Sequence, residues 1–134
     1  IPTKNAVNYL IHEASKGKTI TIYYKGKFFR DLIYISDVVS GIKKIMNSGK
    51  SGELYWISSG KKTWFYQIGN WLKQMSNCKI KYVPIPSYTK KVDVGNFVAN
   101  NSKLRALGWK PTVTVKEGVS KTLDYFINSP KKYF

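Results

Sequence analysis

The sequence has one cysteine and one histidine, and these two shortages exclude several kinds of site. A lone Cys78 can form neither an intramolecular disulfide nor a cysteine-based zinc site. His12 falls within a predicted helix and has no second histidine for a metal site and no partner for a serine–histidine pair. We therefore expect no metal ligand and no catalytic residue in this chain, and a structural or surface role for His12.

Acidic residues are also scarce, because 7 Asp and Glu stand against 23 Lys and Arg, which gives a net charge of +16. A charge of this sign favours anionic partners such as nucleotides, nucleic acid or acidic lipid headgroups, and solubility is the simplest alternative. Only Arg30 and Arg105 among the cations are arginine, whereas nucleic-acid readers often use arginine for bidentate contacts. The charge alone therefore names no partner.

Long hydrophobic runs are missing too, since no apolar stretch approaches the ~20 residues that span a bilayer. The composition, 43% apolar and 22% charged, is that of one globular domain. The chain opens at Ile1 rather than at a methionine, and no signal-peptide pattern precedes it. We expect a fragment or processed chain with no membrane partner, in a reducing, cytoplasmic setting.

Apolar periodicity predicts helices that alternate with strands, the pattern of an α/β or α+β fold. A capping box formed by Thr114 and Glu117 should begin the last helix. The run at 53–58 is apolar at consecutive positions, so it should be a strand covered on both faces, as in a parallel sheet. Helices are expected near 4–17, 36–49, 63–75, 102–108 and 115–126, and strands at 18–24, 31–36, 53–58 and 79–86. The second helix should carry an apolar stripe of Val38, Ile42, Ile45 and Met46.

The stretch YYKGKFFRD, residues 23 to 31, places four aromatic residues, two lysines and an Arg–Asp pair around one glycine. It should form a turn between the first two strands. A guanidinium can hold a phosphate with two hydrogen bonds while an aromatic ring lies against a base. Arg30 and this turn, with Lys90 and Lys91 on a later loop, therefore suit a nucleotide. An ordinary β-turn with core aromatics and a surface Arg30–Asp31 pair would explain the same residues.

Several ordered blocks carry a resemblance to a known family. The segments YYKGKFFRDLIYISDVV, LYWISSG and LGWKP occur in this order between about Val7 and Phe126. They resemble a Tyr-Gly-Asp-Gly-Lys-Gln-x-Arg-Asp turn followed by Val-x-Asp-Val, a strand ending in Asn-Ile-Gly, and a Leu-Gly-Trp-x-Pro motif. These motifs belong to the C-terminal part of the NAD-dependent epimerase/dehydratase family, the extended short-chain dehydrogenases that act on nucleotide-diphosphate sugars.

The resemblance implies roles for four residues of the substrate site. Arg30 would contact the diphosphate, and Tyr23 would lie in the segment that lines the nucleobase. Lys91 would replace a second phosphate-binding arginine, and Asp93 would lie near the ribose or orient that loop. The substrate-binding set is then Tyr23, Tyr24, Lys27, Arg30, Lys91 and Asp93. Tyr24 stands where the family has glycine, and Phe28 where it has glutamine, which leaves the sugar open.

The family's glycine-rich dinucleotide loop and helical Tyr-x-x-x-Lys pair, both N-terminal, have no counterpart here. The resemblance thus implies that residues 1–134 are a single α/β (α+β-like) substrate-binding region of a two-domain epimerase or dehydratase. It would bind no cofactor itself, whereas the whole enzyme would use NAD(P). Residues 30–60 should pack with the missing N-terminal Rossmann domain, and without it Tyr55, Trp56 and Ile57 should drive formation of a homodimer or higher oligomer. The alternatives are a basic nucleic-acid-binding module and a non-catalytic nucleotide-sugar binder.

Overall fold

Short strands pair into two separate two-stranded sheets in the computed structural model, which describes residues 5–85 and 95–129. Strands β1 and β4 run parallel, from the pair Ile20–Ile80 to the pair Tyr23–Val83, and β2 pairs with β3 in antiparallel fashion. The elements in chain order are α1 (Ala6–Ser15), β1 (Ile20–Tyr23), the 3-10 turn η2 (Tyr24–Gly26), β2 (Phe29–Arg30), α2 (Ile35–Ser48), β3 (Thr63–Trp64), α3 (Phe65–Met75), β4 (Ile80–Val83), α5 (Ser102–Ala106) and α6 (Val115–Asn128).

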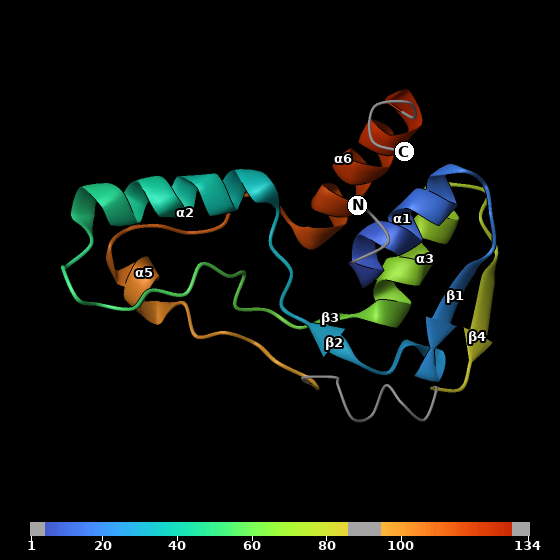
Figure 1. The fold of residues 1–134 in the computed structure, drawn as a ribbon, viewed down its shortest axis with the longest axis horizontal. Helices are drawn as coiled ribbons and strands as arrows, with labels where there is room; N and C mark the ends of the chain where they lie inside the picture. Colours follow the sequence, from blue (N-terminus) through green and yellow to red (C-terminus); the bar gives the residue numbers. More distant parts are fainter. Residues whose placement is uncertain (1–4, 86–94, 130–134) are drawn as a thin grey trace.

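Helices α1, α3 and α6 pack together beside the β1–β4 pair and form the first lobe, on the right of Figure 1. Their apolar stripes meet in one core because each helix repeats apolar residues at helical spacing. The predicted helices and the predicted strands at 18–24 and 79–86 are confirmed in this lobe, within a few residues at their ends. The buried core residues are Leu10, Ile11, Ala14, Ile20, Ile22, Phe65, Ile68, Leu72, Cys78, Val119 and Leu123.

The predicted capping box at the start of α6 is confirmed. The hydroxyl of Thr114 accepts a hydrogen bond from the backbone nitrogen of Glu117, and the Glu117 carboxylate accepts one from the backbone nitrogen of Thr114. These reciprocal bonds satisfy backbone donors that helix ends leave without partners. The expected short helix near 102–108 is also confirmed, as α5 (Ser102–Ala106), which ends before Gly108.

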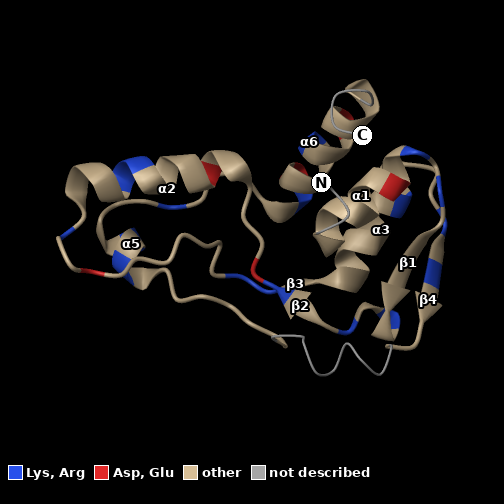
Figure 2. Cartoon of the chain, in the orientation of Figure 1, with Lys and Arg blue, Asp and Glu red and all other residues tan. Residues whose placement is uncertain are grey.

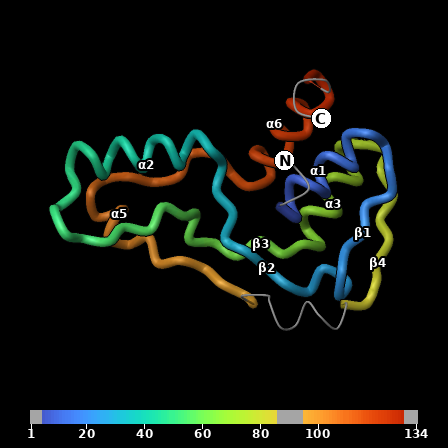
Figure 3. Tube along the Cα trace, in the orientation of Figure 1, coloured from blue at the N-terminus to red at the C-terminus, as the bar shows by residue number. Residues whose placement is uncertain are grey.

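A second lobe extends from the first, on the left of Figure 3, and consists of α2, the returning chain 49–62, and α5 with its flanking segments. Polar contacts join these pieces: the Asn101 amide donates to the carbonyl of Ser58 at 2.8 Å, and the Trp109 indole donates to the Ser40 hydroxyl at 2.8 Å. Ala99, Leu104 and Trp109 are its buried hydrophobic residues within the described part of the chain. The apolar core of this lobe is therefore small.

Two predicted strands are wrong. Residues 31–34 have no regular structure and lead into α2, so the strand here is only β2, and β1 and β2 each pair with another strand instead of forming a hairpin. Residues 53–58 form no strand, and Trp56 is 50% exposed where both faces were expected to be covered. Consecutive apolar residues indicate burial, but no described segment provides a neighbouring strand for them.

Helix α2 leaves several of its apolar side chains exposed, whereas Val38 and Ile45 are half-buried. Asp37 and Gly41 are buried against the rest of the lobe, with Gly41 close to Ile57. The predicted apolar stripe is present in the sequence, but Ile42 is exposed and Met46 is 80% exposed. Water-exposed apolar side chains on the outer face of a helix are unfavourable, so this face suits a further covering surface.

Candidate functional site

The turn at Tyr24–Gly26 has an unusual backbone, because three successive residues have positive φ. The φ angles are 48° at Tyr24, 51° at Lys25 and 71° at Gly26, and the backbone nitrogen of Lys27 donates to the carbonyl of Tyr24 at 2.9 Å. A Cβ at Gly26 would lie 2.4 Å from the backbone nitrogen of Tyr66. Only glycine fits there, and its close approach fixes the turn against the start of α3.

Arg30 lies at the end of β2, where it pairs with Thr63 and is half-buried. Its Nη1 donates to the carbonyl of Phe29 at 2.9 Å, and the guanidinium carbon lies 5.8 Å from the centroid of the Phe28 ring. Phe28 in turn stacks on Phe65 at 4.1 Å between centroids. The cation is therefore held over an aromatic ring that the core supports. A guanidinium held in this way is suited to an anionic oxygen ligand.

Asp31 connects the two lobes. Its carboxylate accepts hydrogen bonds from the backbone nitrogen and hydroxyl of Ser59 at 2.9 and 2.6 Å, from Gly60 N at 3.1 Å and from Ala99 N at 3.2 Å. Asp31 therefore has a role beyond the predicted surface pair with Arg30, because its carboxylate bonds to Ser59, Gly60 and Ala99. These bonds hold β2, and with it Arg30, relative to the second lobe.

Asp37 is a second carboxylate whose structural hydrogen bonds were not predicted from the sequence. It is 2% exposed and accepts hydrogen bonds from the backbone nitrogen and hydroxyl of Thr112 and from the backbone nitrogen of Val113. Burial raises the pKa of Asp37, but these hydrogen bonds and the charge of Lys121 outweigh it and lower the pKa below its ordinary value. Asp37 also lies in the first turn of α2, where a carboxylate interacts favourably with the helix dipole.

The predicted substrate-binding residues fall into two groups. Tyr23, Tyr24, Lys27 and Arg30 lie on one short stretch, and the first three are exposed. Lys91 and Asp93 lie outside the described residues, as does Lys90, so their predicted place beside Arg30 is not tested. The structure thus places Arg30 and the turn beside it, and the phosphate site stays a prediction.

His12 is a buried residue of the first lobe. Its ring meets Phe126 edge-on at 5.5 Å between centroids, and its Nδ1 lies 3.5 Å from a carboxylate oxygen of Glu13. Burial is the main cause that lowers the pKa of His12, Lys16 lowers it further, and Glu13 acts in the opposite direction. No group of three or more potential metal-ligating side chains occurs within residues 5–85 and 95–129.

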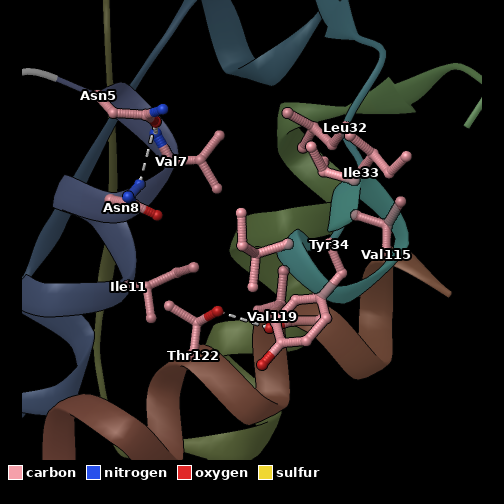
Figure 4. Close-up of a pocket in the computed structure, with 13 residues that line it drawn as sticks. Asn5, Val7, Asn8, Ile11, Leu32, Ile33, Tyr34, Val115, Val119 and Thr122 are labelled. Atoms are coloured by element: carbon pink, nitrogen blue, oxygen red, sulfur yellow. Dashed lines mark hydrogen bonds between the residues drawn. The ribbon is translucent and has the colours of Figure 1, made fainter. Parts of the chain in front are cut away.

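A cleft of about 360 Å³ lies between the first turns of α1, the chain after Asp31, and α6. Figure 4 shows Leu32 and Tyr34 on one side, Val7 and Ile11 on another, and Thr122 below. None of the predicted substrate-binding residues lines it. A sequence signal for this cleft is the apolar run Leu32, Ile33 and Tyr34 after Asp31. In the structure these three residues belong to no helix or strand.

Among the described residues, Lys and Arg positions are spread along the backbone of both lobes (Figure 2). A nucleic-acid-binding protein usually concentrates such charges on one face or along one helix. Within the described residues, none of the helices has the length and apolar character needed to cross a membrane.

Comparisons with known proteins agree with the sequence resemblance. The family model for GDP-mannose 4,6 dehydratase matches residues 1–122. Escherichia coli dTDP-glucose 4,6-dehydratase 1 is 26% identical over 91% of this chain and 36% of its own length. UDP-glucuronic acid decarboxylase 1 of Xenopus tropicalis is 30% identical over 90% of this chain and 28% of its own length. The chain therefore spans about a third of these relatives.

Solved structures share the fold. The UDP-glucose 4-epimerase of Thermotoga maritima, crystallised with UDP-glucose, is 26% identical, has a TM-score of 0.81, and is matched over 95% of this chain and 40% of its own. The Bacillus anthracis dTDP-glucose 4,6-dehydratase in complex with NAD is 19% identical with a TM-score of 0.81, over 96% of this chain and 41% of its own. The chain thus belongs to the GDP-mannose 4,6-dehydratase family, among the extended short-chain dehydrogenases that act as NAD-dependent dehydratases and epimerases on nucleotide sugars.

Proposed function

We propose that this chain is the nucleotide-sugar-binding part of an NAD-dependent dehydratase or epimerase and is catalytically incomplete by itself. The observation that carries the proposal is the half-buried Arg30, held over the Phe28 ring beside a turn with two exposed tyrosines. A fixed guanidinium can bind a diphosphate, and exposed aromatic rings can receive a base. Two relatives support this ligand class, since one was crystallised with UDP-glucose and the Streptomyces venezuelae dehydratase with NAD and TYD.

The roles of the individual residues follow from the family resemblance. Arg30 binds the diphosphate, with Lys91 as a second cation on the following loop. Tyr23 lies against the nucleobase, and Lys27 adds positive charge at the turn. Asp93 contacts the ribose or orients the loop that carries Lys91. A lysine offers a point charge and not a planar fork, so the second phosphate contact is expected to be less directional than an arginine contact.

NAD would supply the hydride acceptor in the whole enzyme, and the described residues do not fit it. Dinucleotide sites need a strand that passes through a glycine-rich turn into a helix, so that backbone N–H groups meet the pyrophosphate. Here β1 enters the turn Tyr24–Gly26 and then β2. Strand β2 leads into α2 through residues 31–34, which contain no glycine, and β3 joins α3 directly. We therefore assign this chain the binding and orientation of the sugar nucleotide, and derive no redox step from it.

The exposed face of α2 supports a second part of the proposal, that residues 30–60 pack against the cofactor-binding domain. Buried Asp37 and Gly41 lie on the opposite side of the helix from this face. The exposed apolar side chains of this α2 face are Ile35, Val39, Ile42 and Met46. Leu54 and Trp56, on the neighbouring chain 49–62, are also apolar and exposed. Several exposed apolar side chains on one helix face are typical of an interface. In the isolated chain, the same surface should lead to self-association.

Ligand binding tests the proposed function and separates it from nucleic-acid binding. We expect the chain to bind UDP or dTDP and their sugar conjugates more tightly than uridine or thymidine, because the diphosphate meets Arg30. Isothermal titration or ligand-observed NMR would measure this, with a single-stranded oligonucleotide titrated at several salt concentrations for comparison. Equal affinity for nucleoside and nucleoside diphosphate would contradict the proposal. Tighter oligonucleotide binding with a steep salt dependence would favour the nucleic-acid alternative.

A further inference from the structure

The backbone at Tyr24 and Lys25 is unfavourable for the residues that occupy it. Both have φ angles near 50°, in the left-handed region, where a Cβ approaches the following carbonyl oxygen. Glycine occupies this region without that cost, and the sequence places glycine only at the third position of the turn, Gly26. A tyrosine therefore stands where a smaller residue would make the turn more stable.

No interaction among residues 5–85 and 95–129 explains this choice. The Tyr24 side chain makes no hydrogen bond or ring contact with other residues in the described part of the chain, and it is 56% exposed. Its neighbour Tyr23 is 41% exposed and ends β1. Local strain that the fold does not require is a reason to look for a functional role.

The backbone that carries the Tyr24 ring is held in place by its neighbours. Gly26 lies directly against the backbone of Tyr66 at the start of α3, and β1 is held by its pairing with β4. The turn continues within a few residues to Phe28 and Arg30, the aromatic ring and the cation described above. A ring fixed at one end and exposed at the other can stack on a planar ligand without losing much conformational freedom.

We infer that Tyr24 is a base-binding residue that stacks on the nucleobase of the bound sugar nucleotide. This inference rests on the proposed function, since it adds a base-binding ring to the diphosphate site at Arg30. The shape of the ring, and not its hydroxyl group, supplies the stacking surface. Nucleotides with a base should therefore depend on Tyr24, whereas inorganic pyrophosphate should not.

Four variants of the 134-residue chain test the inference by titration with UDP, dTDP and pyrophosphate. Tyr24→Gly should weaken UDP and dTDP binding roughly 5- to 150-fold, the range for the loss of one aromatic–base stack, and leave pyrophosphate binding unchanged. Tyr24→Phe should keep UDP affinity within about twofold, because the ring remains. Lys25→Gly is the matched control, since it relieves the same kind of strain without removing a ring. Arg30→Ala should weaken all three ligands.

Thermal unfolding of the same variants completes the test. Neither glycine replacement should lower the midpoint of unfolding, because both positions have left-handed backbone angles. Unchanged UDP affinity in Tyr24→Gly would overturn the inference. An equal loss of UDP affinity in Lys25→Gly, with pyrophosphate affinity unchanged, would also overturn it, because the effect would then come from the turn's backbone and not from the ring or the lysine charge. If Arg30→Ala weakens UDP while Tyr24→Gly does not, the inference fails and the proposed function stands. If the folded wild-type chain binds neither UDP nor pyrophosphate, both fail.

Discussion

The carboxylate of Asp37 accepts hydrogen bonds from the backbone nitrogen and the hydroxyl of Thr112, at 3.0 and 2.8 Å. This relationship joins the first turn of α2 to the segment that precedes α6, and so links the second lobe to the helices of the first. A third bond, from Val113, reaches the other carboxylate oxygen. Both oxygens therefore face donors, as a charged carboxylate requires when it is buried.

Replacement of Asp37 by asparagine should destabilise the protein. The amide would direct an N–H₂ group at one of the two sets of donors, so a buried N–H would lose its acceptor. We expect a loss of about 1 to 3 kcal/mol in the free energy of unfolding, measured by urea denaturation with circular dichroism. Asp124→Asn, which changes an exposed carboxylate on α6, should have little effect. Equal stability of the two variants would contradict the role given to Asp37.

Protonation of His12 should make the protein less stable in mild acid. Burial lowers the pKa of His12 in the native state below its ordinary value of 6.5, so the unfolded chain takes up the proton first as the pH falls. The stability present above pH 6.5 is then lost as the pH falls through the native pKa. Urea midpoints measured from pH 7.5 to about pH 5 should fall for the wild type and fall less steeply for His12→Leu. The same slope in both proteins would show that another group is responsible.

Gly26 and Gly17 offer a matched test of how the turn is held. Both have positive φ, at 71° and 65°, but an added Cβ meets Tyr66 backbone at Gly26 and no atom within 4 Å at Gly17. Gly17→Ala should cost about 1 to 2 kcal/mol from backbone conformation alone. Gly26→Ala should cost more, because the steric conflict adds to the same conformational term. Similar urea midpoints for the two variants would mean that the turn is free to move away from α3.

The helices of the first lobe could be predicted because their apolar repeats face one another within the chain. Ile68, Leu72, Val119 and Leu123 are all buried, as their spacing indicates. The capping box at Thr114 was equally predictable, since its two residues are three positions apart. Local signals of this kind need no knowledge of distant partners.

The parts that could not be predicted depend on distant partners. Asp31 bonds to residues 28 and 68 positions away, and Asp37 to residues 75 and 76 positions away, which no local pattern indicates. The apolar run at 53–58 was misassigned as a buried strand because its expected covering is not among the described residues. Positive φ at Tyr24 and Lys25 was unexpected because neither is glycine. Arg30 was identified from its motif, but its support by Phe28 and Phe65 required coordinates.

The exposed face of α2 predicts how the isolated chain behaves in solution. We expect concentration-dependent self-association, measured by sedimentation velocity, because the apolar side chains around Met46 would otherwise face water. The double variant Ile42→Lys, Met46→Lys should shift the chain toward monomer without lowering its unfolding midpoint. Ile127→Lys, at an exposed apolar position on α6, is the control and should leave association unchanged. A wild-type chain that stays monomeric at high concentration would contradict this use of the surface.

Arg30 provides the most direct test of the account, since the binding of a nucleotide diphosphate depends on its guanidinium. Titration of UDP into wild type, Arg30→Ala and Arg105→Ala measures its contribution, with Arg105 as the same charge change in the second lobe. The predicted result is a loss of about 1.5 to 3 kcal/mol in binding free energy for Arg30→Ala, the range for hydrogen bonds to a charged group, and little change for Arg105→Ala. Unaltered UDP affinity in a folded Arg30→Ala chain would contradict the central claim.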